Sequence, residues 1–211
     1  AQARSMIALL DYGAGNLRSV EKALRFVGGD VELVQSPDGM KDASAVVLPG
    51  VGAFDDCVNA MQRQELLAAS RKFIETGRPF LGICVGYQAM FERSEEFDSR
   101  AAGLGLFAGS VVRFPDGQGL KIPQIGWNQI EIVQPECPIF EGVENGSHVY
   151  FVHSFYPQPE DDSIAVCRTT YGVEFASAIW RDNVYATQFH PEKSQKVGLT
   201  ILQNFVDLAK G

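Results

Sequence analysis

The sequence predicts an α/β fold built on an open mixed sheet that is parallel at its centre and flanked by helices. In the first half of the chain, short apolar runs alternate with segments of helical periodicity, an order typical of parallel strands joined by helical crossovers. After about residue 100, strand-like runs follow one another without long helices between them, which favours antiparallel neighbours. A last helical segment ends the chain.

The first half contains apolar runs that are expected to be parallel strands: MIALL (6–10), VELVQ (31–35), AVVLPG (45–50) and RPFLGI (78–83). Between them, apolar residues recur at spacings of three and four, which predicts helices. Asn16 is of a type that can cap the first helix, and the Gly28–Gly29 pair would end it. A long helical stretch is expected from about Phe54 to Thr76 with a break near Arg63, and CVGYQAMF (84–91) would open another.

The second half contains the expected antiparallel strands SVVRF (110–114), WNQIEIV (127–133), HVYFVHS (148–154), SIAVCRT (163–169), ASAIWRD (176–182) and NVYATQF (183–189). Asp182 and Asn183 would form a hairpin turn between the last two. A closing helix is expected from about Lys193 to Ala209, with apolar residues on one stripe. No repeat or linker divides the chain, so residues 6–211 are expected to form one domain, and AQARS (1–5) is interpreted as a cloning remnant.

The composition excludes several classes of protein. A formal net charge of −8 argues against nucleic acid as the main partner, because a phosphate-binding surface needs clustered Lys and Arg. No apolar stretch approaches the roughly 20 residues of a membrane span. The four cysteines show no CxxC pair and no metal-ligand spacing, which indicates a reduced, cytoplasmic protein without a metal site.

Cys84 is the strongest candidate for a catalytic residue. It lies in GICVG, the pattern G-x-C-x-G, between an expected strand and an expected helix. A nucleophile elbow has this spacing, because the turn is so sharp that the residues two before and two after the nucleophile must be small. A thiol at the start of a helix also benefits from the helix dipole. The other cysteines are expected to be buried as small apolar residues (Cys57, Cys137 and Cys167).

A cysteine nucleophile needs a base, and His190 is the best candidate among the three histidines. It follows the apolar run VYATQF and precedes Pro191 and Glu192, so the imidazole and the carboxylate two residues on could share one face of an extended segment. His148 is expected at the surface. His153, inside an apolar run, is expected to be structural from the residues alone.

The turn LPGVGAF (48–54) completes the candidate site. Its two glycines allow the backbone amides to point outward, although such a sequence by itself is more typical of an ordinary turn. VVLPG, FLGIC and ATQFH place Gly50, Cys84 and His190 just past three apolar strands. Strand ends of this kind meet at one edge of an open α/β sheet. The residues therefore predict a cysteine acyl-transfer site with an oxyanion held by backbone amides, and they leave the acyl group open.

With PGVG, GICVGYQ and HPE in this order, the sequence resembles the class I glutamine amidotransferases, which implies a flavodoxin-like fold. DYGAGN (11–16), PQIGWN (123–128) and YFVHSF (150–155) resemble, within that class, the glutaminase subunits of imidazole glycerol phosphate synthases of histidine biosynthesis. The resemblance runs from about Met6 to the C-terminus and implies a glutaminase that needs no cofactor. It further implies a heterodimer with a separate cyclase subunit, a (β/α)₈ barrel that needs about 250 residues of its own.

The resemblance also implies roles for single residues. Cys84 would attack the side-chain amide of glutamine, with His190 as base and Glu192 orienting it. The oxyanion donors would come from Gly50, Val51, Gly52 and Val85, and the substrate would contact Gly52, Gln88, His153, Ser154 and Phe155. The family commonly has a tyrosine at the position of Phe155. This difference affects one substrate contact and leaves the chemistry unchanged. The face that docks on the cyclase would include Asn16, Gln124, Trp127 and Asn128.

Other interpretations stay open at this point. A glutaminase serving a different synthase would share the triad, and a thiol hydrolase would keep Cys84 and His190 but ignore free glutamine. A binding protein on the same fold would have lost a triad residue. DYGAGNLR superficially suggests dinucleotide binding, but Arg18 occupies the third glycine position. Because uncoupled hydrolysis would waste glutamine, we also hypothesise a resting state in which the Val51 amide is turned away.

Overall fold

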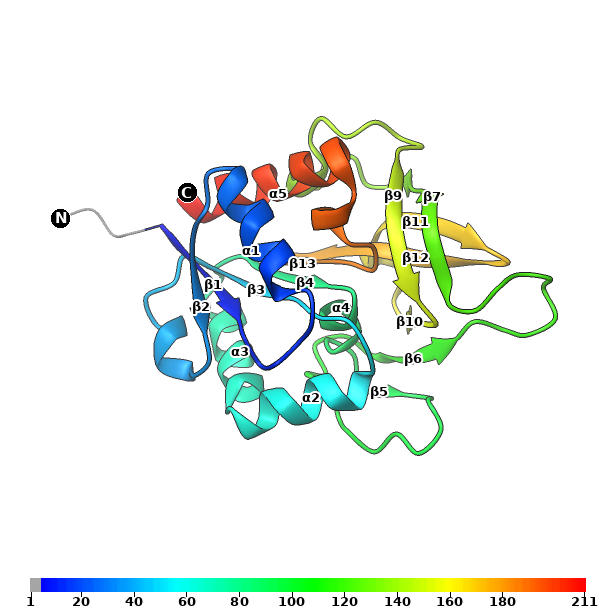
Figure 1. Ribbon diagram of the computed structural model, residues 1–211, viewed down its shortest axis with the longest axis horizontal. Coiled ribbons are helices and arrows are strands. Elements are labelled where there is room, and N and C mark those ends of the chain that lie inside the picture. Colours follow the sequence, from blue (N-terminus) through cyan, green and yellow to red (C-terminus); the bar gives the residue numbers. More distant parts are fainter. Residues whose placement is uncertain (1–4) are drawn as a thin grey trace.

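The structure is a computed structural model that describes residues 5–211, so the interpretation of AQARS concerns residues that, except for Ser5, lie outside the described range. The main sheet has eight strands in the order β2-β1-β3-β4-β13-β12-β11-β8 (Figure 1). The first five of these are parallel, namely β2 (Asp30–Val34), β1 (Met6–Leu10), β3 (Ala45–Leu48), β4 (Phe80–Ile83) and β13 (Val184–Thr187). The antiparallel remainder consists of β12 (Val173–Arg181), β11 (Ala165–Tyr171) and β8 (Glu131–Ile132).

Helices cover both faces of this sheet (Figure 1). One face packs against α1 (Leu17–Phe26) and α5 (Gln195–Lys210), the other against α2 (Phe54–Arg63), α3 (Leu66–Glu75) and α4 (Val85–Gln88). Short 3-10 helices are η1 (Pro37–Met40), η2 (Pro138–Phe140), η3 (Asp162–Ile164) and η4 (Pro191–Lys193). β1 is buried throughout and contributes alternate residues to two apolar clusters, because successive side chains of a strand point to opposite faces. The predicted open α/β sheet with a parallel core is confirmed.

Not every predicted strand belongs to the main sheet. β5 (Arg93–Ser94), β6 (Gly109–Arg113) and β10 (Phe155–Pro159) form a three-stranded sheet, and β7 (Gln124–Gln129) pairs with β9 (His148–His153) in a ribbon. Burial alternates along β9, so one face packs inward while the other stays partly open to solvent. Fully buried strands suit the middle of a sheet covered on both faces, whereas an alternating strand suits an outer layer.

Local predictions are mostly confirmed. The long helical stretch breaks at Gln64–Glu65, where Glu65 adopts a positive φ of 59°, and Asp182–Asn183 forms the turn between Arg181 and its partner Val184. α4 is shorter than CVGYQAMF suggests. Asn16 lies at the N-cap position of α1 as predicted, but its side chain makes no capping bond and its φ is 68°. The side-chain amide is instead directed to another part of the molecule, described below.

The C-terminal ends of β3, β4 and β13 lie side by side at one edge of the sheet, since β4 pairs in parallel with both of the others. The segments that follow these ends contain Gly50, Cys84 and His190 respectively. The fold thus brings the three predicted motifs to one place, where open α/β sheets have their ligand sites. Among residues 5–211, no helix is long and apolar enough to cross a bilayer.

Candidate active site

Cys84 forms a strained elbow between β4 and α4. Its φ is 56° and its ψ −110°, a conformation that non-glycine residues adopt rarely. A Cβ on Gly82 would lie 2.7 Å from the carbonyl oxygen of Gly86, and one on Gly86 would overlap the carbonyl oxygen of Leu48. Both flanking glycines are therefore needed because backbone occupies the space of their missing side chains.

His190 and Glu192 form a close, buried pair. The Nδ1 of His190 donates to Oε1 of Glu192 over 2.6 Å, and the two side chains are 1% and 0% exposed. Nε2 of His190 is buried without a hydrogen-bond partner among the described residues, so it is the nitrogen free to exchange a proton. Burial by itself lowers the pKa of His190, but adjacent Cys84 and Glu192 overcome this and raise the pKa to about 10. The imidazole can therefore hold a proton taken from the thiol.

Asn16 reaches this pair from the far end of the sequence. Its Nδ2 donates to Oε1 of Glu192 over 3.2 Å, the same oxygen that accepts from His190, while Oε2 of Glu192 is buried without a partner. The loop before α1 thus contacts the carboxylate that orients His190. The asparagine next to the glycines of DYGAGN marked this residue in the sequence. Its contact with Glu192 could be seen only in the tertiary structure.

The glycine turn after β3 is in a closed orientation. The Val85 amide donates to the carbonyl oxygen of Gly50 over 3.3 Å. Because the C=O and N–H of a trans peptide point in opposite directions, the Val51 amide of the same peptide faces away from the elbow. The Val51 and Val85 amides are therefore both unavailable to an oxyanion in this state. Tyr12 supports the turn from behind, as its buried hydroxyl donates to the carbonyl oxygen of Pro49 over 2.6 Å.

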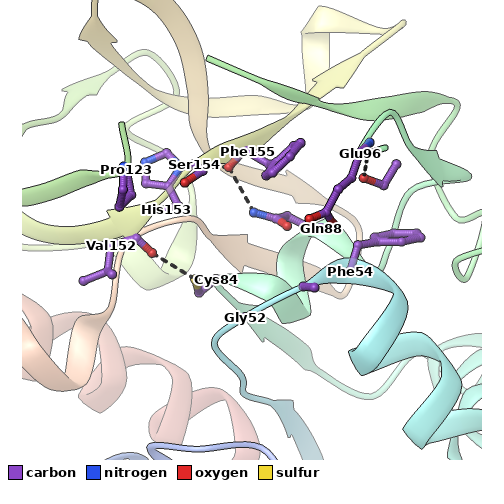
Figure 2. A pocket seen from close by; sticks show the side chains of 12 residues that line it. Gly52, Phe54, Cys84, Gln88, Glu96, Pro123, Val152, His153, Ser154 and Phe155 are labelled. Carbon is purple, nitrogen blue, oxygen red and sulfur yellow. Dashed lines mark hydrogen bonds between the residues drawn. The ribbon is translucent and has the colours of Figure 1, made fainter. Parts of the chain in front are cut away.

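A cavity of about 290 Å³ opens beside Cys84 (Figure 2). Its lining includes all the residues predicted to contact a substrate, namely Gly52, Gln88, His153, Ser154 and Phe155, together with Cys84. Nε2 of Gln88 donates to the carbonyl oxygen of Phe155 over 3.0 Å and to Oε1 of Gln188 over 3.2 Å. With both protons of this amide engaged, the Gln88 oxygen is the atom left for a ligand.

His153 is both structural and part of the cavity wall. Its Nδ1 lies 2.8 Å from the Phe155 carbonyl oxygen and its Nε2 2.8 Å from Nε2 of Gln124. A carbonyl only accepts and an amide nitrogen only donates, so the proton sits on Nδ1. Burial lowers the pKa of His153 to about 4, so the ring is neutral and unsuited to hold a proton near neutral pH.

The residues predicted for docking differ in exposure. Trp127 is 47% exposed on β7 and packs edge-on against Tyr150, and its neighbour Ile125 is 63% exposed. Gln124 is only 3% exposed and is bonded to His153, so this side chain lies beneath the surface. Nδ2 of Asn128 donates to Oε1 of Gln124 over 2.9 Å and thus connects the outer ribbon with the wall of the cavity.

Two residues at the site were missed by the sequence interpretation. Glu96 lines the cavity, and Figure 2 shows its carboxylate extending toward Gln88. Gln188 is fully buried and its Nε2 lies 3.6 Å from Sγ of Cys84. Glu96 stands in an ordinary acidic stretch, SEEFD, and gave no signal. Gln188 precedes His190 by two residues, so its position in the sequence could have indicated that it lies near the site. In the described part of the chain, no group of three or more His, Cys, Asp or Glu residues could hold a metal ion.

Comparisons with known proteins agree with this geometry. Residues 8–208 match the family model of glutamine amidotransferase class-I. The chain is 50% identical over 208 residues to the imidazole glycerol phosphate synthase subunit HisH of Syntrophotalea carbinolica, covering 96% of this chain and 100% of that one. It is 50% identical over 199 residues to the subunit of the same name from Aquifex aeolicus, covering 93% and 94%.

The fold is also found among solved structures. PurLQS from Thermotoga maritima aligns with a TM-score of 0.76 at 20% identity, over 96% of this chain and 97% of that one. At this identity the likeness concerns the fold alone. The family model and the full-length relatives decide the classification: the chain belongs to the class I glutamine amidotransferases and, among them, to the HisH subunits of imidazole glycerol phosphate synthase.

Proposed function

We propose that the chain hydrolyses glutamine to glutamate and passes the ammonia to a cyclase subunit on a separate (β/α)₈-barrel chain. The convergence of Cys84 and the His190–Glu192 pair on one cavity carries this proposal. The name of the relatives, a subunit of a synthase, supports a partner. The cyclase would combine ammonia with a phosphoribulosyl formimino aminoimidazole carboxamide ribonucleotide, and its products would be imidazole glycerol phosphate and aminoimidazole carboxamide ribotide.

The reaction proceeds through a thioester. His190 Nε2 takes the thiol proton, and the sulfur of Cys84 attacks the carboxamide carbon of glutamine. The tetrahedral intermediate collapses as the C–N bond breaks, and His190 returns its proton to the departing ammonia. Water then attacks the glutamyl thioester, with His190 as base, and releases glutamate and the free thiol. Glu192 holds the proton-bearing Nδ1 throughout and stabilises the imidazolium.

The closed turn explains how the free subunit would avoid wasting glutamine. One flip of the Gly50–Val51 peptide removes the Gly50 carbonyl from the Val85 amide and turns the Val51 amide toward the site. A single motion therefore supplies both oxyanion donors, and each such donor is worth on the order of 10² to 10³ in rate. The turn is held by Tyr12, and Val51 lies 3.5 Å from the Cβ position of Gly15, so the loop DYGAGN contacts the turn directly.

The docking face would comprise this loop and the exposed part of β7. Asn16 links it to Glu192, and Trp127 with Asn128 form its outer part, whereas Gln124 acts from below through His153. A partner that covers this face would touch the loop DYGAGN, whose Tyr12 holds the glycine turn and whose Asn16 bonds Glu192. The cytoplasmic location predicted from the sequence is supported by the four thiols, which are all unpaired.

Glutamate release by the chain alone and with a purified cyclase subunit plus its nucleotide ligand tests this function. We expect hydrolysis to be weak for the free chain and to rise at least about a hundredfold in the complex, because a missing oxyanion donor costs that much. Cys84→Ala in the same complex should release no glutamate. Strong activity of the free chain that ignores the cyclase would contradict the proposed partner, and no release under any condition would contradict the glutaminase.

Glu96 is expected to bind the α-ammonium group of glutamine together with the free oxygen of Gln88. Glu96→Gln removes the negative charge while it keeps the shape, so the KM for glutamine should rise by about 10- to 100-fold, the value of a charged hydrogen bond, with a smaller change in kcat. Steady-state kinetics of the complex would measure this. Glu95→Gln, an exposed neighbour outside the cavity, is the matched control and should leave KM unchanged. Equal KM values for the two variants would contradict the assignment.

A further inference from the structure

Gln188 is a buried amide next to the nucleophile, and the mechanism above assigns it no part. It is 0% exposed and follows the last residue of β13, Thr187, at the edge of the sheet that bears the site. Its Nε2 lies 3.6 Å from Sγ of Cys84, a hydrogen-bonding distance for sulfur. Burying a primary amide is costly unless its polar atoms find partners, so its placement against the thiol calls for a physical reason.

The orientation of this amide is determined by its neighbours. The Phe155 carbonyl can only accept, so the nitrogen of Gln88 must face it, at 3.0 Å. The same nitrogen lies 3.2 Å from Oε1 of Gln188, which can only accept. Nε2 of Gln188 is consequently the atom that faces Cys84. The backbone carbonyl of Phe155 thus directs an N–H donor at the sulfur through two amides.

A fixed donor favours the thiolate over the thiol. A thiolate accepts hydrogen bonds more strongly than a thiol, and a hydrogen bond to the charged form stabilises that form. A second polar contact of the Cys84 sulfur has the opposite effect, because the thiol donates to the Val152 carbonyl oxygen over 3.8 Å and this contact exists only while sulfur is protonated. Gln188 and Val152 therefore stand at the sulfur as partners of its two protonation states.

Few other titratable groups act on Cys84. Tyr12 and Cys57 approach from the loop after β1 and from α2, and burial is the main reason that their pKa values are raised, for Cys57 to about 12. Both stay neutral near neutral pH. His190, backed by Glu192 and facing His153, has a pKa raised to about 10, so it keeps its proton near neutral pH. The side-chain amide of Gln188 does not titrate. Its effect on the Cys84 thiol can therefore be separated from the effects of these titratable neighbours.

We propose that Gln188 is a positioning residue that donates to Sγ of Cys84, holds the sulfur toward the cavity and stabilises its thiolate, and that Gln88 and the Phe155 carbonyl fix the direction of this donor. The inference deepens the proposed glutaminase function, on which its catalytic consequence rests. The reactivity of the Cys84 thiol can be measured without glutamine, so failure of this inference and failure of the proposed function are distinguishable.

The test is the pH dependence of Cys84 alkylation by iodoacetamide in the full chain, followed by mass spectrometry of the peptide that contains Cys84. In Gln188→Leu the donor is lost, and the midpoint of the pH profile should rise by about one unit, as expected for a lost hydrogen bond to a charged group. Gln188→Glu keeps the shape and the acceptor for Gln88 but places a carboxylate at the sulfur, so its midpoint should rise further. This second variant serves if the leucine variant does not fold.

Thr187→Val is the matched control. Its hydroxyl is also fully buried at the end of β13 and donates to the Phe189 carbonyl oxygen over 2.9 Å, away from the sulfur. Its alkylation midpoint should equal that of the unsubstituted chain. Midpoints unchanged in both Gln188 variants, or shifted equally in Thr187→Val, would overturn the proposal. A shifted midpoint in the Gln188 variants, together with no glutamate release by the unsubstituted chain in the cyclase complex, would support the role of Gln188 and contradict the glutaminase.

Discussion

Replacement of His190 by alanine is expected to lower kcat for glutamine hydrolysis in the cyclase complex by about 10⁵-fold, in the range seen when a triad base is removed. In the proposed mechanism the same imidazole takes the proton from Cys84 and returns it to ammonia, so both halves of the reaction would lose their proton carrier. No other histidine can replace it, since His153 is neutral with a pKa near 4 and its nitrogens are engaged. Single-turnover and steady-state glutamate release would measure the loss.

Two variants define the scale of this effect. Glu192→Gln removes the charge that orients and stabilises the imidazolium, and a loss of about 10²- to 10⁴-fold is expected, smaller than that of His190→Ala. His148→Ala, at an exposed position on β9, is the matched histidine control and should leave kcat unchanged. If His190→Ala retained more than about a hundredth of the activity, the assignment of the base would be wrong, because removal of a triad base typically costs far more.

Replacement of Gly86 by alanine is expected to destabilise the chain by at least about 3 kcal/mol, the upper part of the range for overpacking. The added Cβ would overlap the carbonyl oxygen of Leu48 and lie 3.0 Å from its carbon. Both atoms belong to the backbone of β3, which pairs with β1 and β4, so the neighbour cannot move aside without breaking the sheet. Urea unfolding followed by circular dichroism would measure the change, and the elbow of Cys84 should be lost with it.

Gly117→Ala separates this overlap from the general cost of replacing a glycine. Gly117 has a φ of 86° and nothing within 4 Å of its Cβ position, so alanine there should cost only about 1–2 kcal/mol for the left-handed backbone. Gly86 does not have a left-handed φ, and its effect is expected from the overlap alone. A loss at Gly86 no larger than at Gly117 would show that the elbow tolerates a side chain there.

Much of the fold was accessible from the sequence because it depends on neighbours along the chain. Apolar runs and glycine positions predicted β1, β3, β4 and β13 and the helices between them, since local sterics and burial decide these elements. The spacing of Gly82, Cys84 and Gly86 predicted the elbow, because a sharp turn between a parallel strand and a helix leaves no room for side chains. The separate pairing of β7 with β9 was not predicted, since strand partners depend on which surfaces remain uncovered after the main sheet has formed.

By itself, the sequence predicted Cys84 as nucleophile, His190 as base and the edge of the sheet where they meet. Only the tertiary structure decided three finer features: the bond from Asn16 to Glu192, the Gly50 carbonyl against the Val85 amide, and the amide of Gln188 at the sulfur of Cys84. The first and third join residues 176 and 104 positions apart, so no local pattern signals them. The second is one orientation of the Gly50–Val51 peptide, which the glycine on its N-terminal side leaves free to turn, and the surrounding contacts select it.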